Sequence, residues 1–307
     1  MTKILLTGAT GFLGCAIRNE LQDTDYDFSS LCGHTDCNLV NEEDTLARFY
    51  KEKPDIVINT ASEVGGIGLN QTNPFGLMSH NLQIGLNVIN SAIFAGVKKF
   101  IQIGTICSYP EVPNHIPFKE EDLWYGRADF SNRPYGVAKL ALMELLNAAE
   151  RQFGIKHTTI MCANLYGPGD NFKEESSHVI PALIKKFVLA KELGLPSVDC
   201  WGDGTATRDF LYVEDAAKAV VKAIETDVDV VNIGTGLESS IKFTANCIKS
   251  ILNYQGQIKW LTDKPNGQPR RVLCIDKAKE TLKWEPKVGI YCGLRKTIDY
   301  YLENKVE

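Results

Sequence analysis

A glycine-rich turn near the N-terminus constrains the fold of this chain more than any other feature. The segment GATGFLG (residues 8–14) follows the apolar run KILLT (residues 3–7). Glycines at Gly8, Gly11 and Gly14 allow a tight turn, close approach of a pyrophosphate, and close packing of a helix on a strand. We therefore predict a dinucleotide site where a first strand meets a first helix. The cofactor-lining residues expected in this turn are Gly8, Thr10, Gly11, Phe12 and Leu13.

Short apolar runs alternate with helical patterns through the first half of the chain. The runs cover residues 3–7, 55–60, 98–104 and 157–163, with a weaker one at 26–31, and amphipathic helices are expected at 41–52, 78–95 and 134–153. This alternation is typical of right-handed βαβ units and a parallel sheet covered on both faces. We predict an α/β fold, a doubly wound parallel-sheet Rossmann domain with a smaller α/β lobe.

The pattern changes after Gly167-Pro168-Gly169. A helix is expected at about 180–193, a turn at 202–207, and a late strand at 230–234 that returns to the sheet. We predict a dinucleotide-binding domain at 1–165, completed by about 206–234, and a second lobe from 166–205 and 235–307. Ligands of doubly wound sheets bind at the carboxyl ends of the strands, so the site is expected between the lobes.

Composition excludes several classes of function. The net charge is -5 and no long block of Lys or Arg is present, so binding to nucleic acid or to a membrane surface is not expected. No apolar run approaches the ~18 residues of a membrane span, and the first residues lack a signal-peptide pattern, so we expect a cytoplasmic protein. The nine cysteines are scattered without metal-ligand spacing, which favours reduced thiols and no metal site.

The segment after the second strand bears on the choice of cofactor. No Asp or Glu closes that strand, where a ribose-binding carboxylate would indicate NAD. Instead the chain continues with His34, which could face a 2′-phosphate, and with Asn38 and Leu39. We therefore expect NADP(H), with these three residues at the cofactor.

A tyrosine and a lysine four residues apart carry the candidate chemistry. Tyr135 and Lys139 follow Pro134 and lie on one face of the expected helix. A nearby ammonium favours the phenolate, so the tyrosine can exchange a proton with a carbonyl or alcohol oxygen. Thr105, at the end of the fourth strand, adds a hydroxyl to this pair. A dinucleotide-dependent oxidoreductase is the function that these residues indicate.

The chain resembles the extended short-chain dehydrogenase/reductases, and among them the GDP-L-fucose synthase family, including related GDP-4-keto-heptose reductases. The resemblance covers nearly the whole length. Its motifs are GATGFLG, Val64-Gly-Gly-Ile67, Cys107 with Tyr109-Pro110, Pro134-Tyr-x-x-x-Lys139, Asn164-Leu-Tyr-Gly-Pro168, Asp170-Asn-Phe172, Ser177-His-Val-Ile-Pro-Ala-Leu183, Trp201-Gly-x-Gly-Thr205, Arg208-Asp-Phe-Leu211 and Lys264-Pro-x-Gly-x-Pro-Arg270.

The resemblance implies NADPH-dependent reduction at C4 of a GDP-4-keto-sugar, coupled to epimerisation at C3 and C5. A C4 ketone acidifies the neighbouring C–H groups, so a base and an acid on opposite faces of the ring can invert these centres. The resemblance implies Cys107 as the base and His178 as the acid. Tyr135 and Thr105 would act at the C4 oxygen, and Lys139 would also hold the nicotinamide ribose. Other implied cofactor residues are Ala61, Ser62, Asn164 and Leu165. Implied substrate residues are Val179, Leu183, Lys186, Trp201, Arg208 and Arg270. Helices 78–95 and 134–153 are expected to form a homodimer, as in relatives.

Departures from the family pattern leave alternatives open. Ile106 and Ser108 flank the thiol where the family has Ser and Ile, so we expect the polar groups facing the sugar to differ. Glu63 stands where the family has Lys, and Lys186 where it has Arg. One alternative is a GDP-4-keto-heptose C4-reductase of capsule biosynthesis that does not epimerise. A dehydratase would need Asp-Glu after Thr105, and a non-catalytic NADP-binding regulator would typically lack the Tyr or the Lys.

Overall fold

Six parallel strands form the central sheet, in the order β10-β5-β4-β3-β1-β2. The computed structural model describes residues 2–173, 176–264 and 266–304. The six strands are β1 (Lys3–Thr7), β2 (Asp27–Ser30), β3 (Ile56–Asn59), β4 (Lys99–Thr105), β5 (Lys156–Cys162) and β10 (Val230–Ile233). The sheet, including the weak second strand and the late return of β10, is therefore as predicted. Chain order reverses between β1 and β3, which places the ligand site of this fold at their carboxyl ends.

Side chains of the inner strands alternate between two hydrophobic cores. Ile4 and Leu6 of β1 pack in one core, and Leu5 packs in the other. In β4, Ile101 and Phe100 divide in the same way. Because successive side chains of a strand point to opposite faces, both faces of this sheet are buried, as a doubly wound fold requires.

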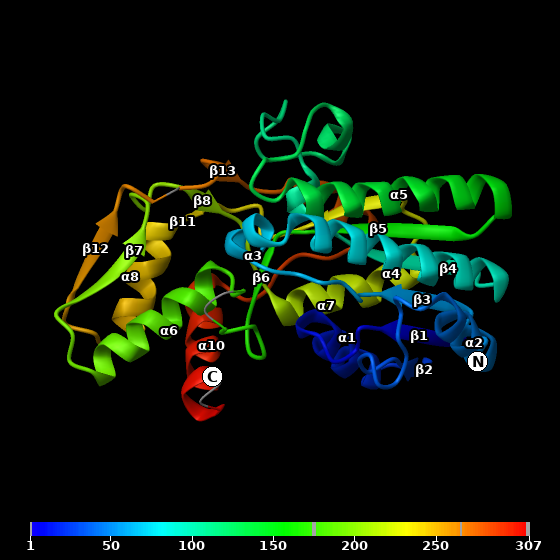
Figure 1. Ribbon diagram of the computed structural model, residues 1–307, viewed down its shortest axis with the longest axis horizontal. Coiled ribbons are helices and arrows are strands. Elements are labelled where there is room, and N and C mark those ends of the chain that lie inside the picture. The colour runs from blue at the N-terminus through cyan, green and yellow to red at the C-terminus, as the bar shows by residue number, and fades with distance from the viewer. Residues whose placement is uncertain (1, 174–175, 265, 305–307) are drawn as a thin grey trace.

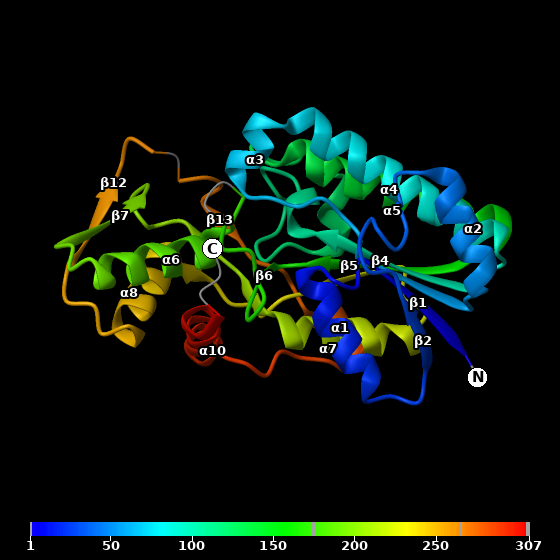
Figure 2. The ribbon, with the colours of Figure 1, turned by 60° about the horizontal axis from the view of Figure 1, so that its bottom comes forward.

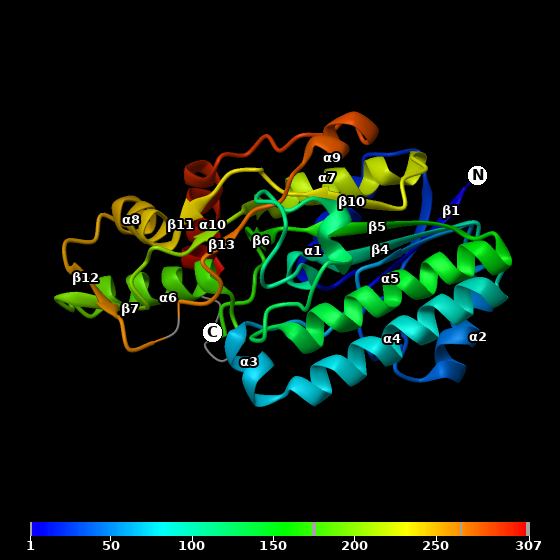
Figure 3. The same ribbon diagram turned by 90° about the horizontal axis from the view of Figure 1, so that it is seen from above.

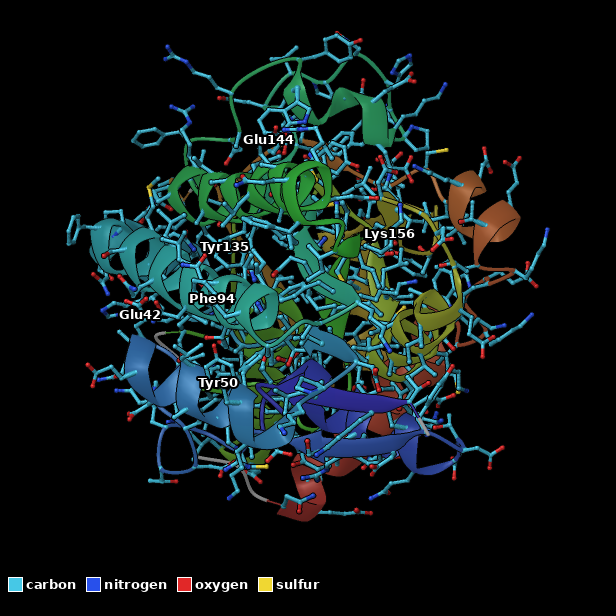
Figure 4. All side chains as sticks on the ribbon, turned by 90° about the vertical axis from the view of Figure 1, so that its right-hand side faces the viewer. Glu42, Tyr50, Phe94, Tyr135, Glu144 and Lys156 are labelled. Atoms are coloured by element: carbon cyan, nitrogen blue, oxygen red, sulfur yellow. The ribbon has the colours of Figure 1, made fainter. Side chains whose placement is uncertain are left out.

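Helices cover the two faces in two layers. One face carries α1 (Phe12–Gln22) and α7 (Val213–Lys222), and the other carries α2 (Glu42–Glu52), α4 (Pro74–Phe94) and α5 (Arg133–Phe153). Figures 1 and 3 show α4 and α5 side by side, and the end-on view in Figure 4 shows α7 across the sheet from them. No helix of the described residues is both long and apolar enough to cross a membrane.

Helix α4 begins four residues before the expected start at residue 78. The side chain of Asn73 accepts a hydrogen bond from the backbone N–H of Gly76, and Pro74 occupies the first turn. This cap and proline favour a helix start that the apolar periodicity did not reveal. The other expected helices, at 41–52, 134–153 and 180–193, lie within one residue of their predicted bounds.

A second lobe packs around its own core. This lobe contains α6 (Val179–Glu192), β7 (Ser197–Trp201), α8 (Ile241–Ile251), β12 (Gln257–Leu261) and α10 (Ile290–Asn304). It lies beyond the carboxyl ends of the sheet strands (Figure 2). The predicted division of the chain at 165 and 235 remains a prediction.

The remaining elements are short. These are α3 (Ile67–Thr72), the 3₁₀ turns η1 (Ile106–Ser108), η2 (Glu120–Trp124) and η3 (Ala223–Glu225), the strands β6 (Asn164–Tyr166), β8 (Thr207–Arg208), β9 (Phe210–Tyr212), β11 (Ser239–Ser240) and β13 (Arg270–Arg271), and α9 (Asp276–Thr281). Strand β8 is the centre of a small sheet with β11 and β13.

Candidate active site

The glycine turn forms a cradle that only small residues allow. A Cβ atom on Gly14 would lie 2.1 Å from the carbonyl oxygen of Gly8, and Gly8 itself has a φ of +68°. Helix α1 follows with Gly11 as N-cap, without a side-chain cap and without an acidic residue in its first turn. Its free N–H groups and helix dipole therefore favour an anion. These residues fit the pyrophosphate of a dinucleotide.

The three cofactor residues expected after β2 differ from one another in their exposure. His34 is exposed and lines a cavity of about 340 Å³ with Arg48 and Lys51. Asn38 is half-buried, and its Oδ1 accepts a hydrogen bond from the N–H of Val40 at 3.2 Å. Leu39 is 7% exposed and packs in the core, so only its backbone is available to a ligand.

Tyr135 and Lys139 lie on the first two turns of α5. The Lys139 Nζ is 5.8 Å from the centroid of the Tyr135 ring, and Lys139 is 3% exposed. Gly136 allows this end of the helix to approach η1, because a Cβ there would lie 2.3 Å from the carbonyl oxygen of Cys107. The Oγ of Ser108 donates to the carbonyl of Gly136 at 2.9 Å. The start of α5 is thus fixed against the turn that carries the thiol.

Burial sets the protonation of this pair. Loss of solvent raises the pKa of the Tyr135 phenol well above its usual value, and a negative charge on Cys107 raises it further. Loss of solvent also lowers the pKa of Lys139 to about 8. Desolvation therefore favours the neutral phenol in the ligand-free protein. That Lys139 keeps Tyr135 partly deprotonated stays a prediction. A neutral phenol is a proton donor, which is the form that ketone reduction needs.

An asparagine of α4, which sequence reasoning missed, holds the segment after β3. The Oδ1 of Asn81 accepts from the Ser62 hydroxyl at 2.5 Å and from the backbone N–H of Glu63 at 3.0 Å. The Ser62 hydroxyl lowers the pKa of the Tyr135 phenol, which opposes the effect of burial. Glu63 pairs with His80 at 2.8 Å. Asn81 is 2% exposed. A polar residue among the apolar positions of the expected helix is the sequence signal that could have identified Asn81, because buried polar groups need hydrogen-bond partners.

Cys107 lies in η1, directly after the end of β4. The Oγ1 of Thr105 accepts a hydrogen bond from the N–H of Cys107 at 3.2 Å, which caps the turn. The Cys107 side chain is half-buried, whereas Ile106 and Ser108 are 1% and 0% exposed. These two departures from the family motif therefore lie in the protein interior. The expectation that they change the polar groups facing the sugar is wrong, because neither side chain reaches the surface.

His178 is the N-cap residue of α6, and its side chain makes no capping hydrogen bond. His178 is exposed, and desolvation lowers the pKa of its ring below the usual value. A lower pKa makes the imidazolium a stronger acid. Val179 follows half-buried, and Leu183 is 5% exposed in the core of the second lobe.

The remaining expected substrate residues extend into the second lobe. The Lys186 Nζ lies 5.9 Å from the ring of Trp201, which is 56% exposed. Exposed indole beside a cation is a surface suited to a planar, electron-rich ring. Asn164 begins β6, where its Nδ2 donates to the carbonyl of Asp209 at 3.0 Å, and Leu165 follows half-buried. Ala61 follows β3 and is half-buried.

Three arginines from β8 and β13 have unlike surroundings. Arg270 is exposed, and its guanidinium forms a bidentate ion pair with Glu238, with Nε 2.9 Å from Oε1. Arg208 is half-buried, and its Nη1 donates to the carbonyls of Thr207 and Gln268, both at 2.7 Å. Arg271, which was not predicted, is 5% exposed and donates to the carbonyl of Ile106 at 3.4 Å. Sequence reasoning could not tell which of two adjacent arginines faces inward.

Residues 4–234 match the model of the NAD dependent epimerase/dehydratase family. The chain belongs to this family. It is 39% identical over 305 residues to GDP-L-fucose synthase 1 of Arabidopsis thaliana, an alignment that covers 98% of this chain and 94% of the relative. The extended short-chain dehydrogenase fold and the GDP-L-fucose synthase resemblance predicted from the sequence are thereby confirmed.

Solved structures agree with this assignment. A GDP-6-OMe-4-keto-L-xylo-heptose reductase from C. jejuni has a TM-score of 0.89 and 27% identity, covering 99% of this chain and 98% of the other. MlghC, a GDP-mannoheptose C4 reductase from Campylobacter jejuni solved with NADP bound, has a TM-score of 0.85 and 28% identity over 98% of each chain.

Proposed function

We propose that the protein reduces the C4 ketone of a GDP-4-keto-sugar with NADPH, after Cys107 and His178 have epimerised C3 and C5. The cofactor is NADP(H), as predicted from the sequence, and the NADP-bound C4 reductase supports this. The observation that carries the proposal is that Tyr135 lies one helical turn from Lys139, at a helix start where Gly136 packs against the Cys107 turn. Burial favours the neutral phenol at this position. The enzyme is thus a nucleotide-sugar oxidoreductase.

Epimerisation uses the residues of η1 and α6. The thiolate of Cys107 removes a proton from the carbon next to the C4 ketone, which leaves an enolate on the sugar. The imidazolium of His178 returns a proton to the opposite face of that carbon and inverts it. Solvent can reprotonate His178, because the residue is exposed. Each inversion exchanges one substrate proton for a solvent proton.

Reduction uses the start of α5. Bound NADPH supplies a hydride to C4. Tyr135 donates its phenolic proton to the oxygen that becomes the C4 hydroxyl, and Thr105 hydrogen-bonds the same oxygen. Lys139, whose pKa of about 8 leaves it mostly charged at pH 7, favours the phenolate left behind. The ketone, one hydride and one proton give the alcohol.

The experiment supplies GDP-4-keto-6-deoxymannose and a GDP-4-keto-heptose, each with NADPH in deuterated water. We expect NADPH oxidation with both C3 and C5 deuterated in the product. NADPH oxidation without deuterium would support a reductase that does not epimerise, as in the heptose alternative. That alternative is favoured by the similarity to the heptose reductase. No NADPH oxidation with either sugar would refute the proposed reaction.

We also propose a homodimer built on α4 and α5. Leu86, Phe94 and Phe153 of these helices are large apolar side chains with 39%, 63% and 56% exposure. Apolar side chains on two adjacent helices are suited to burial against a second copy. Light scattering after size exclusion should give twice the mass of the 307-residue chain. A monomer mass at micromolar concentration would refute this interface.

A further inference from the structure

The position of His178, the proposed acid, depends on the backbone around it, because its side chain makes no capping hydrogen bond. On one side its carbonyl accepts a hydrogen bond from the N–H of Ala182 at 3.0 Å, in the first turn of α6. On the other side lie Ser176 and Ser177. What these two residues contact therefore decides where the imidazole stands.

Ser176 and Ser177 contact Gly66, the N-cap residue of α3. The N–H of Gly66 donates to the carbonyl of Ser176 at 3.1 Å, and a Cβ on Gly66 would lie 2.5 Å from the carbonyl oxygen of Ser177. The φ of Gly66 is -65°, so lack of space, and not the backbone conformation, requires glycine here. Figures 1 and 3 show α3 close to the start of α6. The Val64-Gly-Gly-Ile67 motif thus supports the residues that precede His178.

Asn70 of α3 fixes the direction of this contact. Its Nδ2 donates to the carbonyls of Gly65 and Gly66, at 3.0 and 3.1 Å. The carbonyl of Gly65 and the N–H of Gly66 belong to one planar peptide unit, so holding the first also sets the direction of the second. Asn70 is 4% exposed. A chain of hydrogen bonds accordingly runs from the Asn70 amide through this peptide to the carbonyl of Ser176.

The Asp170-Asn-Phe172 motif holds Ser176 from the other side. Phe172 is 1% exposed, and its ring packs against that of Tyr301 of α10, with centroids 4.6 Å apart. The Nδ2 of Asn171 donates to the Oγ of Ser176 at 2.8 Å. Ser176 is therefore fixed both to the core of the second lobe and to the segment after β3.

A different asparagine holds the beginning of the segment after β3. Asn81 accepts hydrogen bonds from Ser62 and Glu63, and the Ser62 hydroxyl acts on the pKa of the Tyr135 phenol. Gly66, at the end of the same segment, contacts the residues before His178 instead. The two proposed proton donors are therefore supported through separate asparagines, Asn81 and Asn70.

We propose that Asn70 is a positioning residue for epimerisation, which acts through the Gly65–Gly66 peptide to set the place of His178 relative to the sugar. The proposal rests on the proposed function, in which His178 returns a proton to the sugar. A displacement of about 1 Å can lower the rate of a reaction about 10²-fold, even when its cause lies outside the reacting groups. Reduction at C4 uses Tyr135 and does not need this contact.

The first test measures deuterium exchange at C3 and C5 of GDP-4-keto-6-deoxymannose, in deuterated water with NADP⁺ in place of NADPH. Asn70→Ala removes the two donated hydrogen bonds, and Gly66→Ala pushes against the carbonyl of Ser177. Both variants should exchange at least tenfold more slowly than the wild type. The control is Asn246→Ala, because this exposed asparagine of α8 also donates to the carbonyl four residues earlier. The control should exchange at the wild-type rate.

Reduction separates a displaced His178 from general damage to the site. The epimerised keto-sugar, prepared with Tyr135→Phe and NADP⁺, no longer needs His178. Asn70→Ala should reduce this sugar with NADPH at a rate within threefold of the wild type, because Asn81 holds the part of the segment that bears on Tyr135. An equal loss of exchange and of reduction would overturn the proposal. Exchange at the wild-type rate in either variant would overturn it as well.

A spectroscopic measurement reports on His178 without turnover. In protein with ¹³C-labelled histidine rings, the resonance of His178 is identified by its loss in His178→Gln. Asn70→Ala and Gly66→Ala should both shift this resonance and leave that of His157, a buried residue of β5, unchanged. An unshifted His178 resonance in both variants contradicts the proposal. Failure of both variants to fold would assign the contact to the scaffold, which also contradicts it.

These outcomes distinguish the positioning role from the proposed reaction. If the wild type exchanges no deuterium but both variants shift the His178 resonance, the contact stands and the proposed epimerisation fails. If the wild type exchanges deuterium and the variants do the same, the epimerisation stands and the positioning role of Asn70 fails.

Discussion

Replacing Lys139 by methionine should stabilise the ligand-free protein while abolishing reduction. Lys139 is 3% exposed, and burial lowers its pKa from 10.5 to about 8. A difference of about 2.5 pKa units between the unfolded and folded states costs about 3 kcal/mol of stability wherever the amine is charged in both. Loss of the cation–π contact with Tyr135 removes about 1 kcal/mol. The net gain for Lys139→Met at pH 7 is therefore about 2 kcal/mol.

The pH dependence of this gain follows from the two pKa values. Between pH 8 and 10.5 the unfolded state binds more protons at Lys139 than the folded state, so the wild type recovers stability as the pH rises. The advantage of the variant should therefore shrink by about 2 kcal/mol between pH 7 and pH 9.5. For 307 residues the gain at pH 7 corresponds to roughly 3 °C in the melting temperature.

Differential scanning calorimetry of ligand-free protein at pH 7, 8 and 9.5 tests this reasoning. The control is Lys222→Met, an exposed lysine at the end of α7, whose melting temperature should stay close to that of the wild type at each pH. A variant Lys139→Met that is less stable than the wild type at pH 7 would refute the reasoning. So would a gain that does not change with pH.

Three further substitutions test other parts of the structure. Tyr135→Phe removes the proton donor and should lower kcat by about 10²-fold or more in an NADPH-oxidation assay, with little change in NADP⁺ affinity; a loss under tenfold would contradict the role of Tyr135. Gly14→Ala places a Cβ 2.1 Å from the Gly8 carbonyl oxygen, and should lower the free energy of unfolding by about 1–3 kcal/mol and weaken NADP⁺ binding. The control Gly289→Ala has open space around the new Cβ and should have neither effect. Asp209→Ala leaves the N–H groups of Thr235 and Leu273 without their buried acceptor. Chemical denaturation should show a loss of about 3 kcal/mol in the free energy of unfolding. A variant as stable as the wild type would contradict the importance of this carboxylate.

Local spacing explains why the fold and the candidate site could be predicted from the sequence. The glycines at Gly8, Gly11 and Gly14 lie in one turn after one strand, and Tyr135 and Lys139 are one helical turn apart whatever the rest of the chain does. The order of strand and helix patterns also fixes the class of fold, because parallel strands joined by helices have few arrangements. These features depend on neighbours in the sequence.

The tertiary structure decided which side chains are buried and what surrounds them. Arg270 and Arg271 are equivalent in the sequence, and only the pairing of β13 with β8 turns Arg271 toward Arg208 and Arg270 toward Glu238. The neutral state of Tyr135 likewise depends on loss of solvent, which elements distant in the chain impose. Sequence therefore determined the scaffold and the candidate reacting residues through local geometry. Burial and electrostatics are sums over non-local contacts, so only the folded chain determines them.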